Sequence, residues 1–319
     1  MAGFDDFAHT GPGTLAGRYL RSFWQPVFVS DRLSAGRAVP LRIMSEDFTL
    51  YRGEGGTQLS TGYPTEEYLG LVFAYLGEGE PPPLPRYADF EAEGVLESFS
   101  YVRECNFFNN VENQVDPVHV GFVHRTSAFS EAGLVGVPSV TAAETDYGIE
   151  LRAERPSGVR VSSFLMPTMI NLKGSPEDAR ESGWRDTLAW RLPIDDLSHH
   201  SFNISLTHLS GEAAEAYRRR RGQTPDTAQA VTELSARILR GELAIADVLN
   251  HPSLVNIQDN VAQIGQGRMA DRTAERLGRS DAGVILLRRI WSRELQALAE
   301  GRPLTRWAPP ARLATTAGV

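Results

Sequence analysis

Two histidines five positions apart form the segment of this sequence best suited to metal chemistry. The segment reads Asp116-Pro-Val-His119-Val-Gly-Phe-Val-His124. Two imidazoles at this spacing can share one metal ion only if the backbone departs from an ideal helix, because five residues of unbroken helix rotate the second side chain by about 140°. Gly121 lies between the two histidines, and we expect the chain to break there.

A third ligand is needed to complete such a site. Two histidines and one carboxylate on one face of the metal form the arrangement in which non-haem Fe(II) binds O2 and a substrate together. Asp116, about one helical turn before His119, can accept a hydrogen bond from the second nitrogen of that imidazole and fix its tautomer. Glu112 is the nearest candidate ligand in the sequence. Without further support, a His-x4-His pair is more often structural or exposed than a metal site.

The composition excludes several classes of protein. Of 319 residues, 41% are hydrophobic and 23% are charged, which is typical of a globular protein. The net charge of −8 argues against nucleic acid or an anionic membrane as the main partner. Apolar runs such as 69–76 are too short to span a membrane, and the N-terminal residues do not resemble a signal peptide, so we expect a cytoplasmic protein. The single cysteine, Cys105, excludes an intrachain disulfide.

The elements that position these histidines are strands followed by helices, which predicts an α+β fold with an antiparallel sheet gripped by helices. Residues 15–27 are predicted to form a short helix, and the Gly- and Ser-rich segment 53–68 is typical of a loop. Apolar residues at helical spacing predict a helix that enters the histidine segment from residue 107. Further strands are predicted over residues 38–44, 48–53, 70–76, 139–156, 158–173, 184–195 and 199–210, and further helices over 225–249 and 280–301.

Several motifs together resemble one family, the catalytic α subunits of Rieske non-haem iron aromatic-ring oxygenases, especially the phthalate-dioxygenase-like branch. The similarity covers most of residues 16–300, and the motifs occur in the order that the family uses. The matching segments are the metal-site signature at 112–124, the passage between domains at 63–87, a strand and turn at 190–202, and a C-terminal block that comprises Ile-Gln-Asp-Asn at 257–260 and residues 266–289.

The resemblance implies a division of the chain and a set of site residues. Residues 1–86 correspond to the Rieske-type β region and linker, and residues 87–319 to the helix-grip catalytic domain. His119, His124 and Asp259 are the implied ligands of a mononuclear Fe(II). Asp116 is the implied bridging carboxylate to a cluster on a neighbouring subunit, and Asn113 is expected near the iron.

The implied activity is the O2-dependent hydroxylation or O-demethylation of a small aromatic compound. Electrons come from a reductase or ferredoxin, and the family commonly forms homotrimers. We expect apolar residues of the central strands to line the substrate pocket, although such residues are more often simply core. The candidates are Phe108, Phe164, Met166, Met169, Phe202, Ile204, Leu206 and His208, with Arg185 and Arg191 as possible partners of a substrate carboxylate.

The sequence departs from the family at the [2Fe–2S] cluster. A Rieske cluster is bound by two cysteines and two histidines. This chain has one cysteine in total, and only His9 precedes His119. The cluster segment is missing near residues 57–63, so residues 1–86 are expected to be a truncated remnant, and turnover would depend on an external electron donor.

Two other functions remain compatible with the same residues. The first is a non-catalytic small-molecule-binding protein that has lost its redox cluster. The second is a zinc hydrolase, although no glutamate is placed like the base of a His-Glu-x-x-His motif. The identity of the metal and the uptake of oxygen distinguish these alternatives from an oxygenase.

Overall fold

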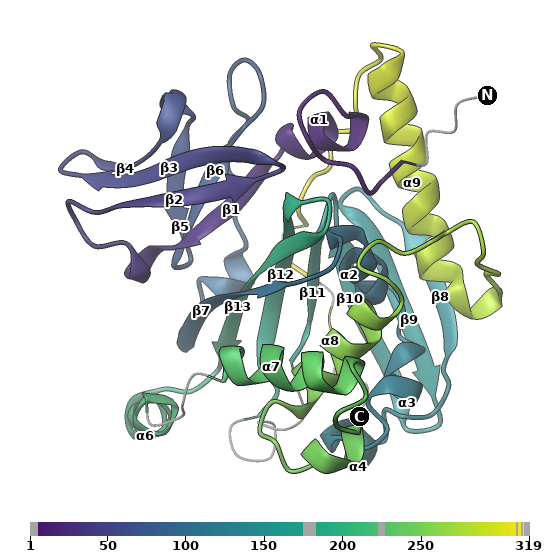
Figure 1. The fold of residues 1–319 in the computed structure, drawn as a ribbon. Coiled ribbons are helices and arrows are strands. Elements are labelled where there is room, and N and C mark those ends of the chain that lie inside the picture. The colour runs from purple at the N-terminus through teal and green to yellow at the C-terminus, as the bar shows by residue number, and fades with distance from the viewer. Residues whose placement is uncertain (1–5, 175–182, 223–226, 311, 314, 316–319) are drawn as a thin grey trace.

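A seven-stranded antiparallel sheet forms the centre of the protein (Figure 1). The computed structural model describes residues 6–174, 183–222, 227–310, 312, 313 and 315. The spatial order of the strands is β7-β13-β12-β11-β10-β9-β8, and each neighbouring pair is antiparallel. The predicted α+β fold with an antiparallel sheet is confirmed. The strands are β7 (Val95–Arg103), β8 (Ser139–Glu144), β9 (Gly148–Arg155), β10 (Gly158–Leu165), β11 (Met169–Lys173), β12 (Asp186–Asp195) and β13 (Ser198–Thr207).

The N-terminal region forms two small sheets of three strands each, in the orders β1-β6-β5 and β2-β3-β4. The predicted helix over 15–27 is too long, because α1 (Leu15–Arg21) ends at Ser22 and the chain continues as a strand that pairs with β6. The predicted loop over 53–68 is wrong, because it contains two short paired strands. The strands are β1 (Trp24–Val29), β2 (Ala38–Ile43), β3 (Glu46–Gly53), β4 (Gly56–Leu59), β5 (Thr65–Tyr68) and β6 (Leu71–Tyr75).

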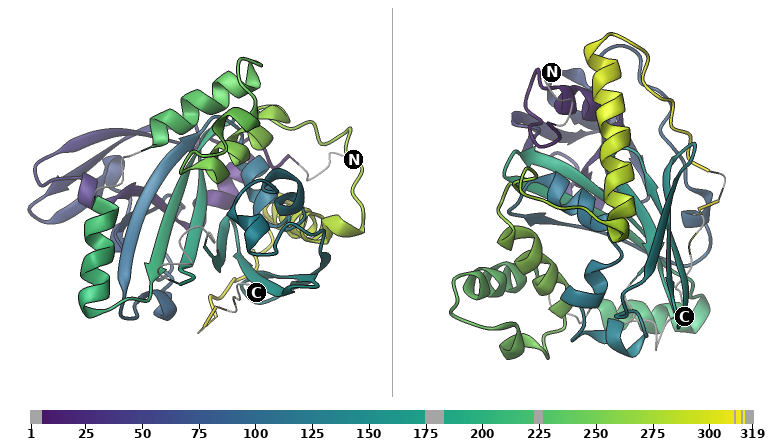
Figure 2. Two further views of the ribbon diagram at one scale, coloured as in Figure 1. Left: turned by 90° about the horizontal axis from the view of Figure 1, so that it is seen from below. Right: turned by 90° about the vertical axis from the view of Figure 1, so that its right-hand side faces the viewer.

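Helices cover the opposite side of the central sheet from these strands. Figure 2 shows the long helix α9 lying against the sheet, where it packs on β8 and β9. Within the part of the chain that the structure describes, no helix is long and apolar enough to cross a bilayer. The helices are α2 (Phe107–Gln114), α3 (His119–Val123), α4 (Ala128–Glu131), α6 (Gly211–Gly222), α7 (Ala228–Leu239), α8 (Leu254–Gly265) and α9 (Ala282–Ala299).

Both faces of the central sheet are buried along most of β12 and β13. On one face, the ring of Trp190 in β12 packs against Phe73 of β6 and Tyr87, with ring centroids 5.8 and 6.3 Å apart. On the other face, α2 and α8 lie over the sheet, and Gln114 of α2 donates a hydrogen bond to the carbonyl oxygen of Ala189 in β12. This second face carries the candidate site.

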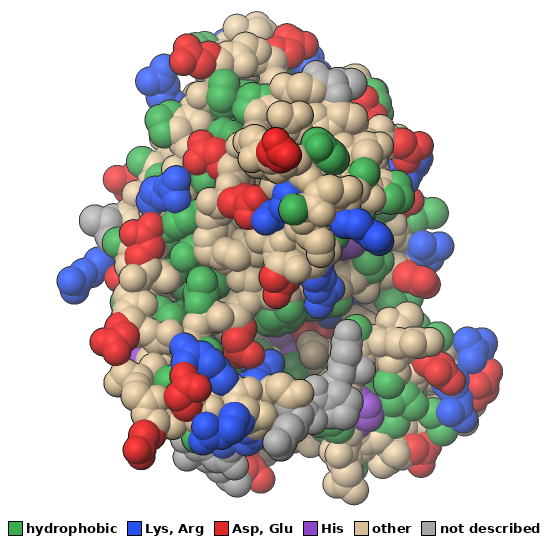
Figure 3. All heavy atoms as spheres, turned by 90° about the vertical axis from the view of Figure 1, so that its left-hand side faces the viewer, with side chains coloured by type: hydrophobic (Ala, Val, Ile, Leu, Met, Phe, Trp, Pro, Cys, Tyr) green, Lys and Arg blue, Asp and Glu red, His purple; other side chains and the backbone are tan. Residues whose placement is uncertain are grey.

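The charges of the N-terminal region are paired locally. Figure 3 shows acidic and basic side chains interspersed on the face that includes the N-terminal strands. Arg52 of β3 pairs with Glu67 of β5 at 2.8 Å, and Arg42 of β2 pairs with Asp47 of β3 at 2.7 Å. Such exposed pairs each contribute little to stability, but they leave no large area of a single sign on this face.

Candidate metal centre and substrate cavity

The chain breaks between α2 and α3, immediately before the first histidine. Pro117 has no amide hydrogen with which to continue a helix, and Asp116 Oδ1 accepts a hydrogen bond from the amide of Val118 at 2.9 Å. The expected break at Gly121 is wrong, because that residue lies inside α3. Glycine is needed there for a different reason, since a Cβ atom would stand 2.7 Å from the carbonyl oxygen of Val135.

His119, His124 and Asp259 converge in space. His119 begins α3, whereas His124 caps its C-terminus with φ −101° and ψ 13°, so the second imidazole leaves the path of the helix. The two imidazole centroids are 5.4 Å apart, and His124 Nε2 lies 3.3 Å from Asp259 Oδ1. One potential ligand atom of each residue lies within 4.8 Å of the other two. The structure thus brings together the two histidines and the remote aspartate of α8.

Hydrogen bonds determine which nitrogen of each imidazole faces this point. His119 Nδ1 contacts the backbone carbonyl oxygen of Asp116, and His124 Nδ1 lies 3.0 Å from Oε1 of Gln258. The amide of Gln258 is oriented by its other end, which donates to Thr126 Oγ1 at 2.9 Å. Each Nδ1 therefore donates, and each Nε2 carries the lone pair, which is the tautomer that binds a metal.

The electrostatics of the group match a cation site. Burial acts to raise the pKa of Asp259, but the close approach of His124 and the charge of Arg103 outweigh it and hold this pKa well below its usual range. Desolvation lowers the pKa of His119 although Asp259 lies close by. At neutral pH the carboxylate is ionised and this imidazole is neutral, as metal ligands must be. Among the described residues, the buried Oδ1 of Asp259 has no hydrogen-bond partner, so the donor set fits a metal ion.

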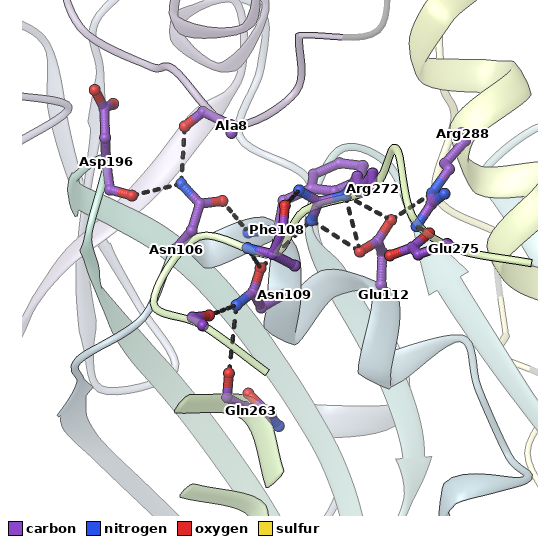
Figure 4. Close-up of polar contacts among 12 residues, drawn as sticks. Ala8, Asn106, Phe108, Asn109, Glu112, Asp196, Gln263, Arg272, Glu275 and Arg288 are labelled. Atoms are coloured by element: carbon purple, nitrogen blue, oxygen red, sulfur yellow. Dashed lines mark hydrogen bonds and ion pairs between the residues drawn. The ribbon is translucent and has the colours of Figure 1, made fainter. Parts of the chain in front are cut away.

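Glu112, the alternative third ligand, points away from the histidines. Figure 4 shows its carboxylate between Arg272 and Arg288, whose nearest nitrogens lie 2.8 and 2.5 Å from its oxygens. The side chain of Glu112 is 12% exposed, and those of the two arginines are 16% and 18% exposed. Both oxygens are therefore occupied in a largely buried ion pair on the far side of α2.

Asp116 and Asn113 lie at the wall of the same cavity. The carbonyl of Asp116, and not its carboxylate, orients His119, while the carboxylate closes the turn before α3. Burial raises the pKa of the Asp116 carboxyl, although the charge of His119 acts in the opposite direction. Asn113 Oδ1 accepts a hydrogen bond from Gln263 Nε2 of α8 at 3.0 Å. Asn113 therefore ties α2 to the helix that carries Asp259.

A cavity of about 280 Å³ opens beside the three residues. Helices α2, α3 and α8 form its roof, and strands β9 to β13 form its floor. The floor combines apolar side chains such as Leu151 and Ile170 with polar ones. The polar floor residues are Arg155, Arg160, Ser162, Arg185, Thr187, Arg191, Asn203 and Ser205.

Most of the predicted pocket residues lie on the other face of the sheet. Asn203, Ala189 and Ile170 are cross-strand neighbours on the cavity face. Phe202 and Ile204 alternate with Asn203 and therefore face the N-terminal strands. The same holds for Met169, a cross-strand neighbour of Trp190 on that face, for Leu206 by alternation, and for Met166, which lines a separate cavity with Met169 and Trp190.

Three further candidates are also absent from the cavity wall. Phe164 lies on the cavity face but is completely buried. Phe108 packs in the core, with its ring centroid 4.8 Å from that of Phe7 and 5.2 Å from that of Trp291. His208 is half exposed and lies 2.6 Å from a carboxylate oxygen of Asp186. Arg185 and Arg191, by contrast, do line the cavity.

The sequence analysis missed Gln258 and the polar floor residues other than Arg185 and Arg191. Nothing in the spacing marks Gln258, since its role depends on a contact with a residue far away in the sequence. The polar floor had a visible signal, because Asn203 and Ser205 alternate with apolar residues along β13. In a sheet with one solvated face, such an alternation points the polar residues outward, and that assumption failed here.

Comparisons with known proteins show which proteins this chain resembles. No family model matches the sequence. Among curated proteins, the 5,5'-dehydrodivanillate O-demethylase oxygenase subunit of Sphingobium sp. (strain NBRC 103272 / SYK-6) is 24% identical over 93% of this chain and 80% of its own length. The phenoxybenzoate dioxygenase subunit alpha of Ectopseudomonas oleovorans is 27% identical over 91% of this chain and 84% of its own length. Over most of its length the chain is thus similar to catalytic subunits of Rieske-type oxygenases.

The fold of the chain is also similar to that of a solved oxygenase. A solved complex of the carbazole-bound oxygenase with ferredoxin, from carbazole 1,9a-dioxygenase, matches with a TM-score of 0.61 and 16% identity, and the match covers 88% of this chain and 92% of that one. The alignment with the O-demethylase subunit spans 361 positions but covers only 93% of these 319 residues, so about 60 positions lie opposite gaps in this chain. The relatives are therefore longer in one or more internal segments.

Proposed function

We propose that this chain binds one Fe(II) through His119, His124 and Asp259 and uses O2 to hydroxylate or O-demethylate a small aromatic compound. The observation that carries the proposal is the approach of three potential ligand atoms to within 4.8 Å of one another, with a buried carboxylate oxygen that accepts no hydrogen bond from the described residues. Two histidines and one carboxylate leave open coordination positions for O2 beside the cavity.

Iron bound there would supply the redox chemistry with O2, and the chain's own residues would supply position and protonation state. Asp116 and Gln258 hold the two imidazoles with Nε2 toward the site. The cavity keeps a substrate beside these ligands, under the roof of α2 and α8. Asp116 is the proposed bridge to a redox centre on a neighbouring subunit of a homotrimer, because it lies at the cavity wall and its backbone carbonyl contacts His119.

We further propose that residues 1–86 are a truncated Rieske-type β region with its linker, and that residues 87–319 form the catalytic domain. The shortened segment is closed by short contacts between neighbouring strands. Thr57 Oγ1 donates to Glu67 Oε1 at 2.5 Å, and the amide of Thr49 donates to Ser60 Oγ at 2.9 Å. With one cysteine, the chain cannot supply the ligands of a [2Fe–2S] cluster, so electrons would come from an external reductase or ferredoxin.

The test begins with the purified full chain, loaded with Fe(II) without oxygen and then desalted. We expect about one iron per chain, no iron–sulfur absorbance, and weak or uncoupled oxygen uptake when a reductase, a ferredoxin and an aromatic compound are added. Iron analysis that gives zero, or a clear Rieske spectrum, would overturn the proposal. Loading with Zn²⁺ in parallel and assaying ester hydrolysis separates the oxygenase from a zinc hydrolase.

A second candidate is a non-catalytic small-molecule-binding protein, and the missing cluster ligands favour it. Such a protein would use the same cavity without redox chemistry. It predicts that aromatic compounds bind and that no oxygen is consumed under any electron supply. Oxygen uptake that depends on both iron and a donor would exclude this candidate.

A further inference from the structure

The cavity floor is rich in arginine. Among the described residues that line the cavity, four carry a guanidinium group and two carry a carboxylate. One of those carboxylates, Asp259, is a proposed iron ligand, so a bound ferrous ion would make the positive excess larger. The six charged residues are Arg155, Arg160, Arg185, Arg191, Asp116 and Asp259.

Three of the arginines lie together at one end of the floor. Arg160 of β10 donates from Nη2 to the carbonyl oxygen of Lys173 at 2.7 Å, so its guanidinium reaches across to β11. Gly174 follows β11 and pairs with Arg185. A Cβ atom at Gly174 would meet Cγ of Arg185 at 2.8 Å and Nε at 3.1 Å, so the side chain of Arg185 lies over the glycine. The guanidinium groups of Arg160 and Arg185 thus approach the end of β11 from opposite sides of that strand.

The described contacts of Arg155 and Arg160 are with backbone carbonyl groups. Arg155 donates to the carbonyl oxygens of Gly136 and Pro117 at 2.7 and 3.0 Å. Burial lowers the pKa of Arg160 to about 10, and the neighbouring charge of Arg155 acts in the same direction. Both remain cations at neutral pH. Among the residues that the structure describes, no carboxylate pairs with either arginine. Cations that are withdrawn from water are costly unless they are paired, and an anion bound beside these two would relieve that cost.

Between these arginines and the proposed iron ligands the floor includes several apolar side chains. Leu151 and Leu172 lie on the cavity wall one row of residues closer to the middle of the sheet, and Ile170 follows in the next row. A planar ring fits against such side chains, whereas an inorganic anion gains nothing from them. The volume of about 280 Å³ suits one substituted ring.

We propose that Arg155 and Arg160 form a carboxylate subsite and that the substrate is an aromatic carboxylate. Its carboxylate is held by paired guanidinium hydrogen bonds, and its ring extends over Leu151 and Ile170 toward His119 and His124. The orientation of the ring toward the iron ligands rests on the proposed function. The anion subsite itself does not depend on iron.

The test uses the full chain without metal and isothermal titration with benzoate, 4-methoxybenzoate and the corresponding neutral amides. We expect each acid to bind at least 10-fold more tightly than its amide. Arg160→Gln should weaken binding of the acids by about 10- to 100-fold and leave the amides unchanged, because it removes a charge-assisted hydrogen bond. Arg160→Lys keeps the charge without the planar fork and should fall in between. Arg152→Gln is the matched control, since Arg152 is exposed on the other face of β9.

Three results would overturn the subsite. The first is that no acid binds more tightly than its amide. The second is that Arg152→Gln reduces the preference as much as Arg160→Gln, which would indicate only a long-range effect of charge. The third is that inorganic phosphate displaces the acids at equal concentration, or that the preference appears only with Fe(II) present. Loss of iron binding or of oxygen uptake would refute the proposed function but would leave this preference in the metal-free chain intact.

Discussion

The two carboxylates that compete for the role of third ligand can be separated by one pair of variants, Glu112→Gln and Asp259→Asn. Each variant replaces a carboxylate by its amide with little change in shape. Glu112 neutralises Arg272 and Arg288 in surroundings where all three side chains are less than 20% exposed. Loss of that charge leaves two partly buried arginines with weaker partners, although Arg288 keeps Glu275 at 2.7 Å.

We expect Glu112→Gln to lower the free energy of unfolding by about 2–4 kcal/mol, the range for charged hydrogen bonds in a largely buried ion pair. For a chain of this size that corresponds to a fall of about 3–6 °C in Tm. The iron content of this variant should stay at about one per chain, because its carboxylate lies outside the site. Asp259→Asn should instead lose nearly all iron.

The iron content is measured after anaerobic loading and desalting, at a temperature below the unfolding transition of each variant. Thermal unfolding, monitored by circular dichroism, gives the Tm. A folded Glu112→Gln protein without iron would show that Glu112 is a ligand. An Asp259→Asn protein that keeps its iron would show that the remote aspartate is not one. Either result would refute the assignment of the site, whereas unequal Tm values alone would not.

Three further predictions concern the surroundings of the site. Gln258→Leu removes the acceptor that orients His124 and should weaken iron binding by about 10- to 100-fold, measured by competition with a chelator. Gln258→Glu keeps an acceptor there and should retain most of the affinity for iron. Burial lowers the pKa of His199 well below its usual value, so below about pH 6.5 this imidazole is protonated in the unfolded chain but not in the native state. The free energy of unfolding should therefore fall by up to about 1.4 kcal/mol for each pH unit below that value. In urea unfolding from pH 7.5 to 5, the free energy of unfolding of His199→Gln should depend less steeply on pH than that of the parent chain. Gly121→Ala should cost about 1–3 kcal/mol because its Cβ would stand 2.7 Å from a carbonyl oxygen, and equal urea midpoints for it and Gly136→Ala, where the space is open, would contradict this.

The sequence predicted those elements whose pattern is local. Helix α9 follows from an amphipathic run after a Ser-Asp start, and the strands from β8 to β13 follow from short alternating segments between turn residues. The strands β4 and β5 were missed because each has only four residues and lies among glycines, so the turn signal dominates the window.

The histidine segment was predicted to break, but at the wrong residue. Gly121 drew attention because glycine permits a departure from the helix, yet the stronger signal was Pro117, which cannot continue one. The glycine is instead explained by the close approach of Val135, a contact that no local pattern encodes.

The third ligand and the pocket depended on information that one sequence does not hold. Asp259 is one of 40 acidic residues, and only the family resemblance singled it out. The pocket face was misassigned because alternation along β13 separates Phe202 and Ile204 from Asn203 and Ser205 but does not say which set meets a cavity. Since β13 is buried on both faces, the apolar set packs against the N-terminal strands and the polar set lines the cavity.

The surroundings of Asp259 explain how a buried carboxylate can remain available to a cation. Arg103 is 2% exposed and lies close enough to help hold the pKa of Asp259 low, yet its own hydrogen bonds go to Asn260 Oδ1 at 2.7 Å and Gln263 Oε1 at 2.6 Å. It therefore fixes α8 against β7 and supplies positive charge to the carboxylate without a hydrogen bond to it. A direct Arg103–Asp259 pair would occupy the carboxylate oxygens as Arg272 and Arg288 occupy those of Glu112. The difference between these two acids lies in where the neighbouring guanidinium groups direct their hydrogen bonds, and that difference makes one a structural ion pair and the other a candidate ligand.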